Sequence, residues 1–80
     1  MEEQDILLKI TGILQNVLKR HSLSVSMATT ASDIDGWDSL SNMMIIDSIE
    51  KNFNVKFKFN EIMKFNNVGD IVACVKKKTS

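Results

Sequence analysis

Apolar residues near the start of the chain recur at intervals of three and four positions, the spacing of one face of a helix. This pattern predicts a helix from about Glu3 to Lys19 with a single apolar stripe. Gly12 lowers the helix propensity by up to about 1 kcal/mol relative to alanine, but the stripe continues through it. The residues of the stripe are Ile6, Leu7, Ile10, Ile13, Leu14, Val17 and Leu18.

The helical pattern stops between about Arg20 and Asp38. Residues 21–27 alternate between polar and apolar types, as a strand does, but the chain offers no partner strand of comparable quality, and an isolated strand is unstable. We therefore expect a long loop, with a short helical turn inside it as an open alternative. Loops of this length are often functional. The residues expected to hold the loop on the core are Leu23 and Val25, together with Met27 or Ile34.

A second helix is predicted to begin at Asp38 or Ser39. The Asp38 carboxylate is a good N-cap, because it can accept hydrogen bonds from the first free backbone amides. Leu40 and Met44 lie on the flank of the apolar stripe, and residues 54–55 end the helix. The residues of the expected stripe are Met43, Ile46, Ile49 and Phe53.

The segment after the second helix alternates in residue type. Val55, Phe57 and Phe59 are separated by Lys56 and Lys58. This alternation predicts an extended connector whose apolar side chains all face the core.

Two further helices complete the expected fold. A short one is predicted at about Asn60 to Lys64, with Asn60 as its N-cap. A longer one is predicted at about Val68 to Lys77, opened by a capping box of Asn67 and Asp70. Its inward residues are expected to be Val68, Ile71, Val72 and Val75. The chain is therefore predicted to be all-α, a small four-helix bundle with three longer helices, one short helix and a long first loop, in one domain over residues 1–80.

The composition argues against several classes of function. Ten basic and ten acidic residues cancel, so no strong field draws the chain to nucleic acid or to an anionic membrane. No apolar run approaches the roughly 18 residues of a membrane span, and the first residues lack the features of a signal peptide. Cys74 is the only cysteine, and its apolar neighbours favour a buried small side chain over a reactive thiol. We expect a cytoplasmic protein that binds neither nucleic acid nor membranes.

Self-contained catalysis is hard to build from this sequence. The only histidine is His21, and no nucleophile turn or oxyanion hole lies near it in the sequence. Asp33, Asp35 and Asp38 are close together, but they lack the spacing of a calcium-binding loop. One histidine and one cysteine are too few ligands for a typical zinc site. We therefore predict a protein that is not an enzyme and holds no metal.

Residues 36–40, Gly-Trp-Asp-Ser-Leu, resemble the start of the second helix in the acyl carrier protein family. The hallmark of that family is Asp-Ser-Leu, found here at residues 38–40. The resemblance continues along the apolar stripe to Phe-Asn-Val at residues 53–55. It returns at residues 67–71, Asn-Val-Gly-Asp-Ile, which match the usual opening of the family's last helix. Because the spacing of all four predicted helices also fits, the resemblance covers almost the whole chain.

The resemblance implies that Ser39 carries a 4′-phosphopantetheine arm, derived from coenzyme A, whose terminal thiol holds an acyl or aminoacyl cargo as a thioester. A phosphodiester on Ser39 suits the positive end of a helix. The resemblance also implies that Asp38 caps the helix and helps a phosphopantetheinyl transferase bind its magnesium ion. Other implied partners are enzymes that activate or transfer acyl or aminoacyl groups in fatty-acid, polyketide or other specialised biosynthesis. We expect the carrier to be a monomer.

An apolar docking surface is expected at Leu40, Met43 and Met44, although Leu40 and Met44 fit a peripheral core position equally well. Trp37 is expected to pack the long loop against the helices, with contact to partners as a second role. Fatty-acid carriers are usually acidic along this helix, whereas this chain has Ser41 and Met44 there and no net charge. These departures favour a specialised pathway whose partners rely on apolar contact rather than on charge.

Two alternatives remain open from the sequence. One is a helical protein-interaction module without a prosthetic group. The other is an aminoacyl or peptidyl carrier of a nonribosomal-type pathway. Whether the carrier holds an acyl or an aminoacyl group, this cargo is expected to be sheltered between the second and third helices, around Ile46, Ile62 and Met63.

Overall fold

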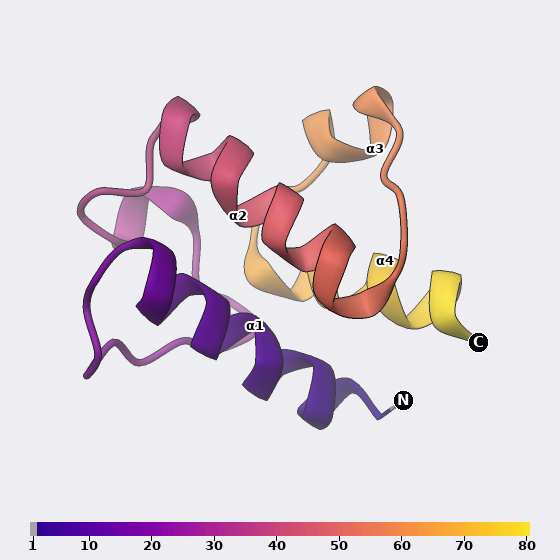
Figure 1. Cartoon of the computed structure of the whole chain (residues 1–80), viewed down its shortest axis with the longest axis horizontal. Helices are drawn as coiled ribbons and strands as arrows, with labels where there is room; N and C mark the ends of the chain where they lie inside the picture. Colours follow the sequence, from indigo (N-terminus) through magenta and orange to yellow (C-terminus); the bar gives the residue numbers. More distant parts are fainter. Residues whose placement is uncertain (1) are drawn as a thin grey trace.

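Helices make up all the regular structure in the computed structural model, which describes residues 2–80. Figure 1 shows α1 (Glu3–Val17) running in the opposite direction to α2 (Ser39–Phe53) and α4 (Val68–Thr79), so that the start of α1 and the end of α4 lie at the same end of the bundle. The predicted all-α four-helix fold with a long first loop is confirmed. The elements are α1 (Glu3–Val17), the single-turn 3-10 helix η1 (Ala31–Asp33), α2 (Ser39–Phe53), α3 (Phe59–Met63) and α4 (Val68–Thr79).

Helix α1 begins where predicted and ends two residues earlier than expected. The chain leaves the helix at Lys19, whose φ of 56° is the left-handed conformation that often ends helices. The amide of Lys19 donates to the Asn16 carbonyl at 3.3 Å, and the amide of Arg20 donates to the Gln15 carbonyl at 2.9 Å. These paired bonds form a Schellman motif, so the turn sets the end of α1 although the apolar pattern continues. The buried residues of α1 are Ile6, Leu7, Ile10, Ile13 and Leu14.

The buried face of α2 is rotated relative to the predicted stripe. Met43 is 71% exposed whereas Ile45 is fully buried, so the prediction that Met43 belongs to the core stripe is wrong. The inward face begins instead at the half-buried Asn42 and continues at steps of three and four residues. A polar residue at its first position hid this face from the hydrophobic pattern. The buried residues of α2 are Ile45, Ile46, Ile49 and Phe53.

The connector after α2 is extended only as far as Lys58. Asn54 ends α2 as predicted by adopting a left-handed φ of 55°, which asparagine tolerates better than most residues. Val55 is half-buried and Phe57 is buried, as expected. Phe59 is 77% exposed, contrary to the prediction. It is the first residue of α3, so the two-residue alternation of an extended chain no longer applies to it.

Helix α3 starts one residue earlier than predicted, so Asn60 lies inside it and is not its N-cap. The Glu61 carboxylate instead accepts a hydrogen bond from the Lys58 amide at 2.7 Å. The pKa of Glu61 is lowered, first by this backbone bond and then by the Lys78 side chain. Lys78 Nζ lies 3.0 Å from Glu61 Oε1, an ion pair that ties the short α3 to the end of α4.

Helix α4 starts at Val68 as predicted and continues to Thr79. The Asn67 side-chain oxygen accepts from the Asp70 amide at 2.9 Å, which confirms Asn67 as the N-cap. The Asp70 carboxylate accepts from the amide of Asn66 at 2.8 Å and not from that of Asn67. The predicted capping box is therefore replaced by two staggered bonds. The buried residues of α4 are those predicted, namely Val68, Ile71, Val72 and Val75.

The long loop between α1 and α2 covers the start of α4 with its own backbone. The amide of Val68 donates to the Thr29 carbonyl at 2.8 Å, and the amide of Gly69 donates to the Met27 carbonyl at 2.7 Å. A Cβ atom on residue 69 would lie 2.9 Å from the Met27 oxygen, so this close approach requires glycine. Ile34 is buried, and η1 supplies the short helical turn. Three further loop residues are partly buried against the core, namely Leu23, Val25 and Met27.

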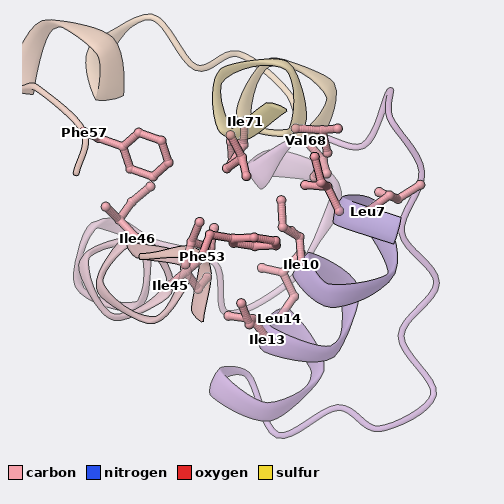
Figure 2. Close-up of a cluster of buried hydrophobic side chains, with 14 residues drawn as sticks. Leu7, Ile10, Ile13, Leu14, Ile45, Ile46, Phe53, Phe57, Val68 and Ile71 are labelled. Atoms are coloured by element: carbon pink, nitrogen blue, oxygen red, sulfur yellow. The ribbon is translucent and has the colours of Figure 1, made fainter. Parts of the chain in front are cut away.

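The hydrophobic core lies where α1 meets α2 and α4, since α1 packs against both. Figure 2 shows the side chains of these three helices converging, with Phe57 joining them from the connector. Phe57 also meets Phe65 edge-on, with ring centroids 5.3 Å apart. This contact holds the link between α3 and α4 against the bundle. Within residues 2–80, no helix has both the length and the apolar character to cross a bilayer.

Candidate functional site

Ser39 is the first residue of α2, and its side chain is exposed to solvent. The residue before it, Asp38, is extended, with φ of −120° and ψ of −169°, so the chain turns sharply into the helix at this point. The side-chain hydrogen bonds at this turn use Asp38 and Ser41. None of those formed among residues 2–80 engages the Ser39 hydroxyl, so no internal hydrogen bond has to be broken for another molecule to reach it.

Asp38 and Ser41 form a reciprocal capping box that fixes the first turn of α2. The Asp38 carboxylate accepts from the Ser41 amide at 3.0 Å, which confirms Asp38 as the N-cap, and the Asp38 amide donates to the Ser41 hydroxyl at 2.8 Å. That hydroxyl in turn donates to the Gly36 carbonyl at 2.7 Å. Gly36 has a φ of 92°, a conformation that favours glycine. The Ser41 hydroxyl is thus used in hydrogen bonds that hold the turn, whereas the Ser39 hydroxyl makes none within residues 2–80.

The start of α2 is electrostatically suited to two kinds of ligand. The pKa of Asp38 is lowered, first by the hydrogen bond from the Ser41 amide and further by the Ser41 hydroxyl and the Leu40 amide. The carboxylate is therefore ionised at neutral pH and attracts cations. The free amides at the positive end of the helix stabilise an anion. The same turn therefore combines a carboxylate that attracts cations with backbone amides that favour an anion.

A pocket of about 330 Å³ opens beside Ser39, within the range of small-molecule sites. On the α2 side it is lined by Trp37, Asp38 and Asn42. Sequence reasoning missed Asn42, although its position three residues after Ser39 places both on the same face of the helix. The apolar side chains lining the pocket from α3, α4 and the link between them are Ile62, Phe65 and Ile71.

Of the three residues expected to shelter a cargo, only Ile62 lines this pocket. Ile46 is buried in the core, and Met63 is 67% exposed. The space beside Ser39 therefore lies closer to the link between α3 and α4 than the sequence suggested. Little in the sequence indicated that Phe65 lines this pocket, because it is an isolated apolar residue between two helices.

The expected docking residues of α2 project into solvent. Leu40, Met43 and Met44 are 73%, 71% and 53% exposed, so they are not peripheral core. On α3, the apolar side chains of Phe59 and Met63 are likewise 77% and 67% exposed. Phe59 was missed as a surface residue because the alternation of the connector placed it inside.

Trp37 packs the end of the long loop against the core, as predicted. Its side chain is half-buried. The indole Nε1–H donates to Asn42 Oδ1 at 2.9 Å, so the residue before the Asp-Ser-Leu motif is bonded to the second turn of α2.

The remaining sequence candidates do not gather into a site. His21 is exposed in the turn after α1, and the Asp33 carboxylate accepts from the Thr30 amide at 2.9 Å, which stabilises η1. In the described part of the chain, no three histidine, cysteine or acidic side chains converge on a possible metal position. Cys74 is half-buried, with its Sγ 3.7 Å from Glu61 Oε2, and burial raises the pKa of its thiol.

Comparison with known proteins gives a consistent result. Residues 8–75 match the family model described as Phosphopantetheine attachment site. The chain is 34% identical over 76 residues to an acyl carrier protein homolog of Mycoplasma pneumoniae, covering 95% of this chain and 90% of that protein. It is 34% identical over 71 residues to an acyl carrier protein of Streptococcus thermophilus, covering 89% of this chain and 92% of that protein. A solution NMR structure of a holo acyl carrier protein from Geobacter metallireducens matches with a TM-score of 0.85 and 41% identity, over 91% of this chain and 84% of that one.

Proposed function

The chain belongs to the phosphopantetheine-attachment family of acyl carrier proteins, and on this premise we propose that Ser39 carries the 4′-phosphopantetheine arm. The observation behind the proposal is the contrast between two serines at the start of α2. Ser39 is exposed and unengaged within residues 2–80, whereas the Ser41 hydroxyl is held by Asp38 and Gly36. A transferase can therefore reach the Ser39 hydroxyl without disturbing the helix.

The surroundings of Ser39 fit the prosthetic group. A phosphodiester on Ser39 lies at the positive end of α2, where anions are stabilised. The pocket beside it combines apolar side chains with the amides of Asn42, Asn66 and Asn67, which suits an arm built from methyl groups, a hydroxyl and two amides. When bound, the group supplies a terminal thiol on which the cargo is held as a thioester.

The chain itself contributes presentation and not catalysis. Among the described residues, no histidine or carboxylate is hydrogen-bonded to the Ser39 hydroxyl, so the base that removes its proton belongs to the transferase. The Asp38 carboxylate holds the first turn of α2 through the Ser41 amide and is exposed. We assign it a second role, in which it helps to bind the magnesium ion of the transferase.

The exposed face of α2 supports partners that bind by apolar contact at Leu40, Met43 and Met44. Its exposed charges are Asp47 and Lys51, whose Oδ2 and Nζ atoms lie 3.0 Å apart and cancel each other. Steering by an acidic helix is therefore weak, which favours a specialised acyl or aminoacyl pathway. We propose as partners a phosphopantetheinyl transferase and the enzymes that load and unload the arm, in the cytoplasm.

The proposal is tested by the intact mass of the protein after incubation with coenzyme A, magnesium and a broad-specificity phosphopantetheinyl transferase. We expect the wild type to gain one phosphopantetheinyl group and Ser39→Ala to gain none. Ser41→Ala is the matched control, because it removes the neighbouring hydroxyl and is expected to gain one group. Circular dichroism of each variant shows whether it is folded.

Two results would contradict the proposal. Loading of Ser39→Ala would place the arm on another residue. Absence of loading of the folded wild type, with a known carrier loaded in parallel, would favour a helical interaction module without a prosthetic group. Once the arm is attached, the enzyme that charges its thiol distinguishes an acyl from an aminoacyl cargo.

A further inference from the structure

We propose that Asn42, held in place by Trp37, is a positioning residue that binds the prosthetic arm in the pocket beside Ser39. This inference rests on the proposed attachment at Ser39 and adds to it a resting position for the arm. It assigns a role to two residues that the attachment step does not use.

The bond between Trp37 and Asn42 fixes which way the Asn42 amide faces. An indole N–H can only donate a hydrogen bond, so the atom 2.9 Å from it is the Asn42 carbonyl oxygen. The Nδ2 group of Asn42 consequently faces away from the indole with its two hydrogens. Since Trp37 is itself packed against the core, the amide is held by a rigid neighbour and loses little freedom when a ligand binds.

The Nδ2 group of Asn42 is available to a ligand. The bond from Trp37 uses only Oδ1, and no other side-chain hydrogen bond formed among residues 2–80 involves Asn42. Every fully buried polar side-chain atom in the described chain has a hydrogen-bond partner. The unbonded Nδ2 is therefore not fully buried, and Asn42 lines the pocket.

The other two asparagines of the pocket belong to the link between α3 and α4 and not to the helix that carries Ser39. The Asn67 side-chain oxygen caps α4, and Asn66 is exposed. Asn42 lies one helical turn beyond Ser39, close to the point at which the arm begins. On the far side of the pocket are Ile62 and Phe65, which can contact the methyl groups of the arm.

The ligand chemistry follows from these groups. The arm carries a hydroxyl and two amide carbonyls, all of which accept hydrogen bonds, and Asn42 Nδ2 donates one. Asn42 thereby favours an arm that lies along the carrier over an arm that extends into solvent. A partner enzyme then has to exchange this bond for its own contacts when it draws the thiol into its active site.

Nuclear magnetic resonance of ¹⁵N-labelled apo and holo protein tests this proposal, with intact mass establishing that the arm is attached. The diagnostic variant is Asn42→Asp, which keeps an oxygen for Trp37 but replaces the donor group by a second acceptor. The matched control is Asn52→Asp on the same helix, where the asparagine is exposed and its Nδ2 donates to the Ser48 carbonyl at 2.8 Å. Both variants add the same charge.

In the wild type, attachment of the arm is expected to shift the Asn42 side-chain amide and Trp37 indole resonances more than the Asn52 side-chain amide. Asn52→Asp should show the same shifts, because Trp37 is the only tryptophan and Asn42 is intact. Asn42→Asp should still gain the arm. In this variant, attachment of the arm should shift the Trp37 indole resonance no more than it shifts the resonances of other α2 residues.

The outcomes separate this inference from the proposed function. A wild type that gains the arm without movement of the Asn42 and Trp37 resonances overturns the inference and leaves Ser39 as the attachment residue. Equal indole shifts in Asn42→Asp and the wild type overturn the role of Nδ2. A folded wild type that gains no arm overturns both proposals. The wild-type comparison decides the matter even where Asn42→Asp does not fold.

Discussion

The Asp38 amide donates to the Ser41 hydroxyl at 2.8 Å, and the Ser41 amide donates back to the Asp38 carboxylate at 3.0 Å. This reciprocal pair makes Ser41 a structural residue. We expect Ser41→Ala to lower the free energy of unfolding by about 1 kcal/mol. Ser39→Ala removes an exposed hydroxyl with no internal hydrogen bond in the described chain, so it should change that free energy by less than about 0.5 kcal/mol. Urea denaturation of the apo proteins measures both, and equal losses would contradict the assignment of roles.

The Asp38 carboxylate should make stability depend on pH. Its pKa is lowered in the folded chain, chiefly by the hydrogen bond from the Ser41 amide, so the unfolded chain binds the proton more readily. The contribution of the Asp38 carboxylate to the free energy of unfolding is therefore fully present above its ordinary pKa of 3.8. It is lost as the pH falls through the lower pKa of the folded chain.

We accordingly expect the wild type to lose more stability than Asp38→Asn on going from about pH 5 to pH 2. Urea denaturation at each pH provides the measurement. Glu61, whose pKa is also lowered, is present in both proteins and cancels in the comparison. Parallel pH profiles for the two proteins would show that the Asp38 carboxylate gains nothing from the capping box.

Two glycines should respond in opposite ways to substitution by alanine. A Cβ on residue 69 would lie 2.9 Å from the Met27 carbonyl oxygen, whereas one on Gly12 meets nothing within 4 Å. Gly69→Ala should lower the free energy of unfolding by about 1–3 kcal/mol, because the long loop has to move. Gly12→Ala should raise it by up to about 1 kcal/mol, because alanine is the better helix former. Thermal unfolding of both variants checks the signs, and a Gly69→Ala protein as stable as the wild type would argue against the close packing of the loop on α4.

The rotation of α2 predicts a large difference between two apolar residues. Ile45 is fully buried and Met43 is 71% exposed. Ile45→Ala should cost about 2–5 kcal/mol of unfolding free energy, whereas Met43→Ala should change it by less than about 0.5 kcal/mol. Urea denaturation of the two variants distinguishes the structure from the face expected from the sequence, for which Met43 would be the costly position.

The fold was largely predictable because each long helix carries an apolar stripe and two of them carry a strong cap. Ile71 and Val75 of α4, and Ile10 and Leu14 of α1, are buried where the periodicity places them. Met43 was misplaced because methionine fits an exposed surface as well as a core. The hydrophobic pattern predicts reliably that a segment is helical. It predicts poorly which face of the helix is buried when the first residue of that face is polar.

Ser39 and Asp38 could be singled out from the sequence because a short motif in a suitable helical context carries specific information. Asn42 could not be singled out in this way. Its significance depends on a hydrogen bond from Trp37 and on a pocket that Phe65, which follows α3 along the chain, helps to line. Such convergence of distant segments is a property of the tertiary structure, and no local spacing encodes it.

The half-burial of Cys74 bears on the lifetime of a thioester. Thiolates attack thioesters, and this chain contains a single cysteine. Burial, and then the negative charge of Glu61, raises the pKa of the Cys74 thiol. Both effects disfavour the thiolate, the form that attacks a thioester, and so make Cys74 a poor acceptor for the cargo of the arm.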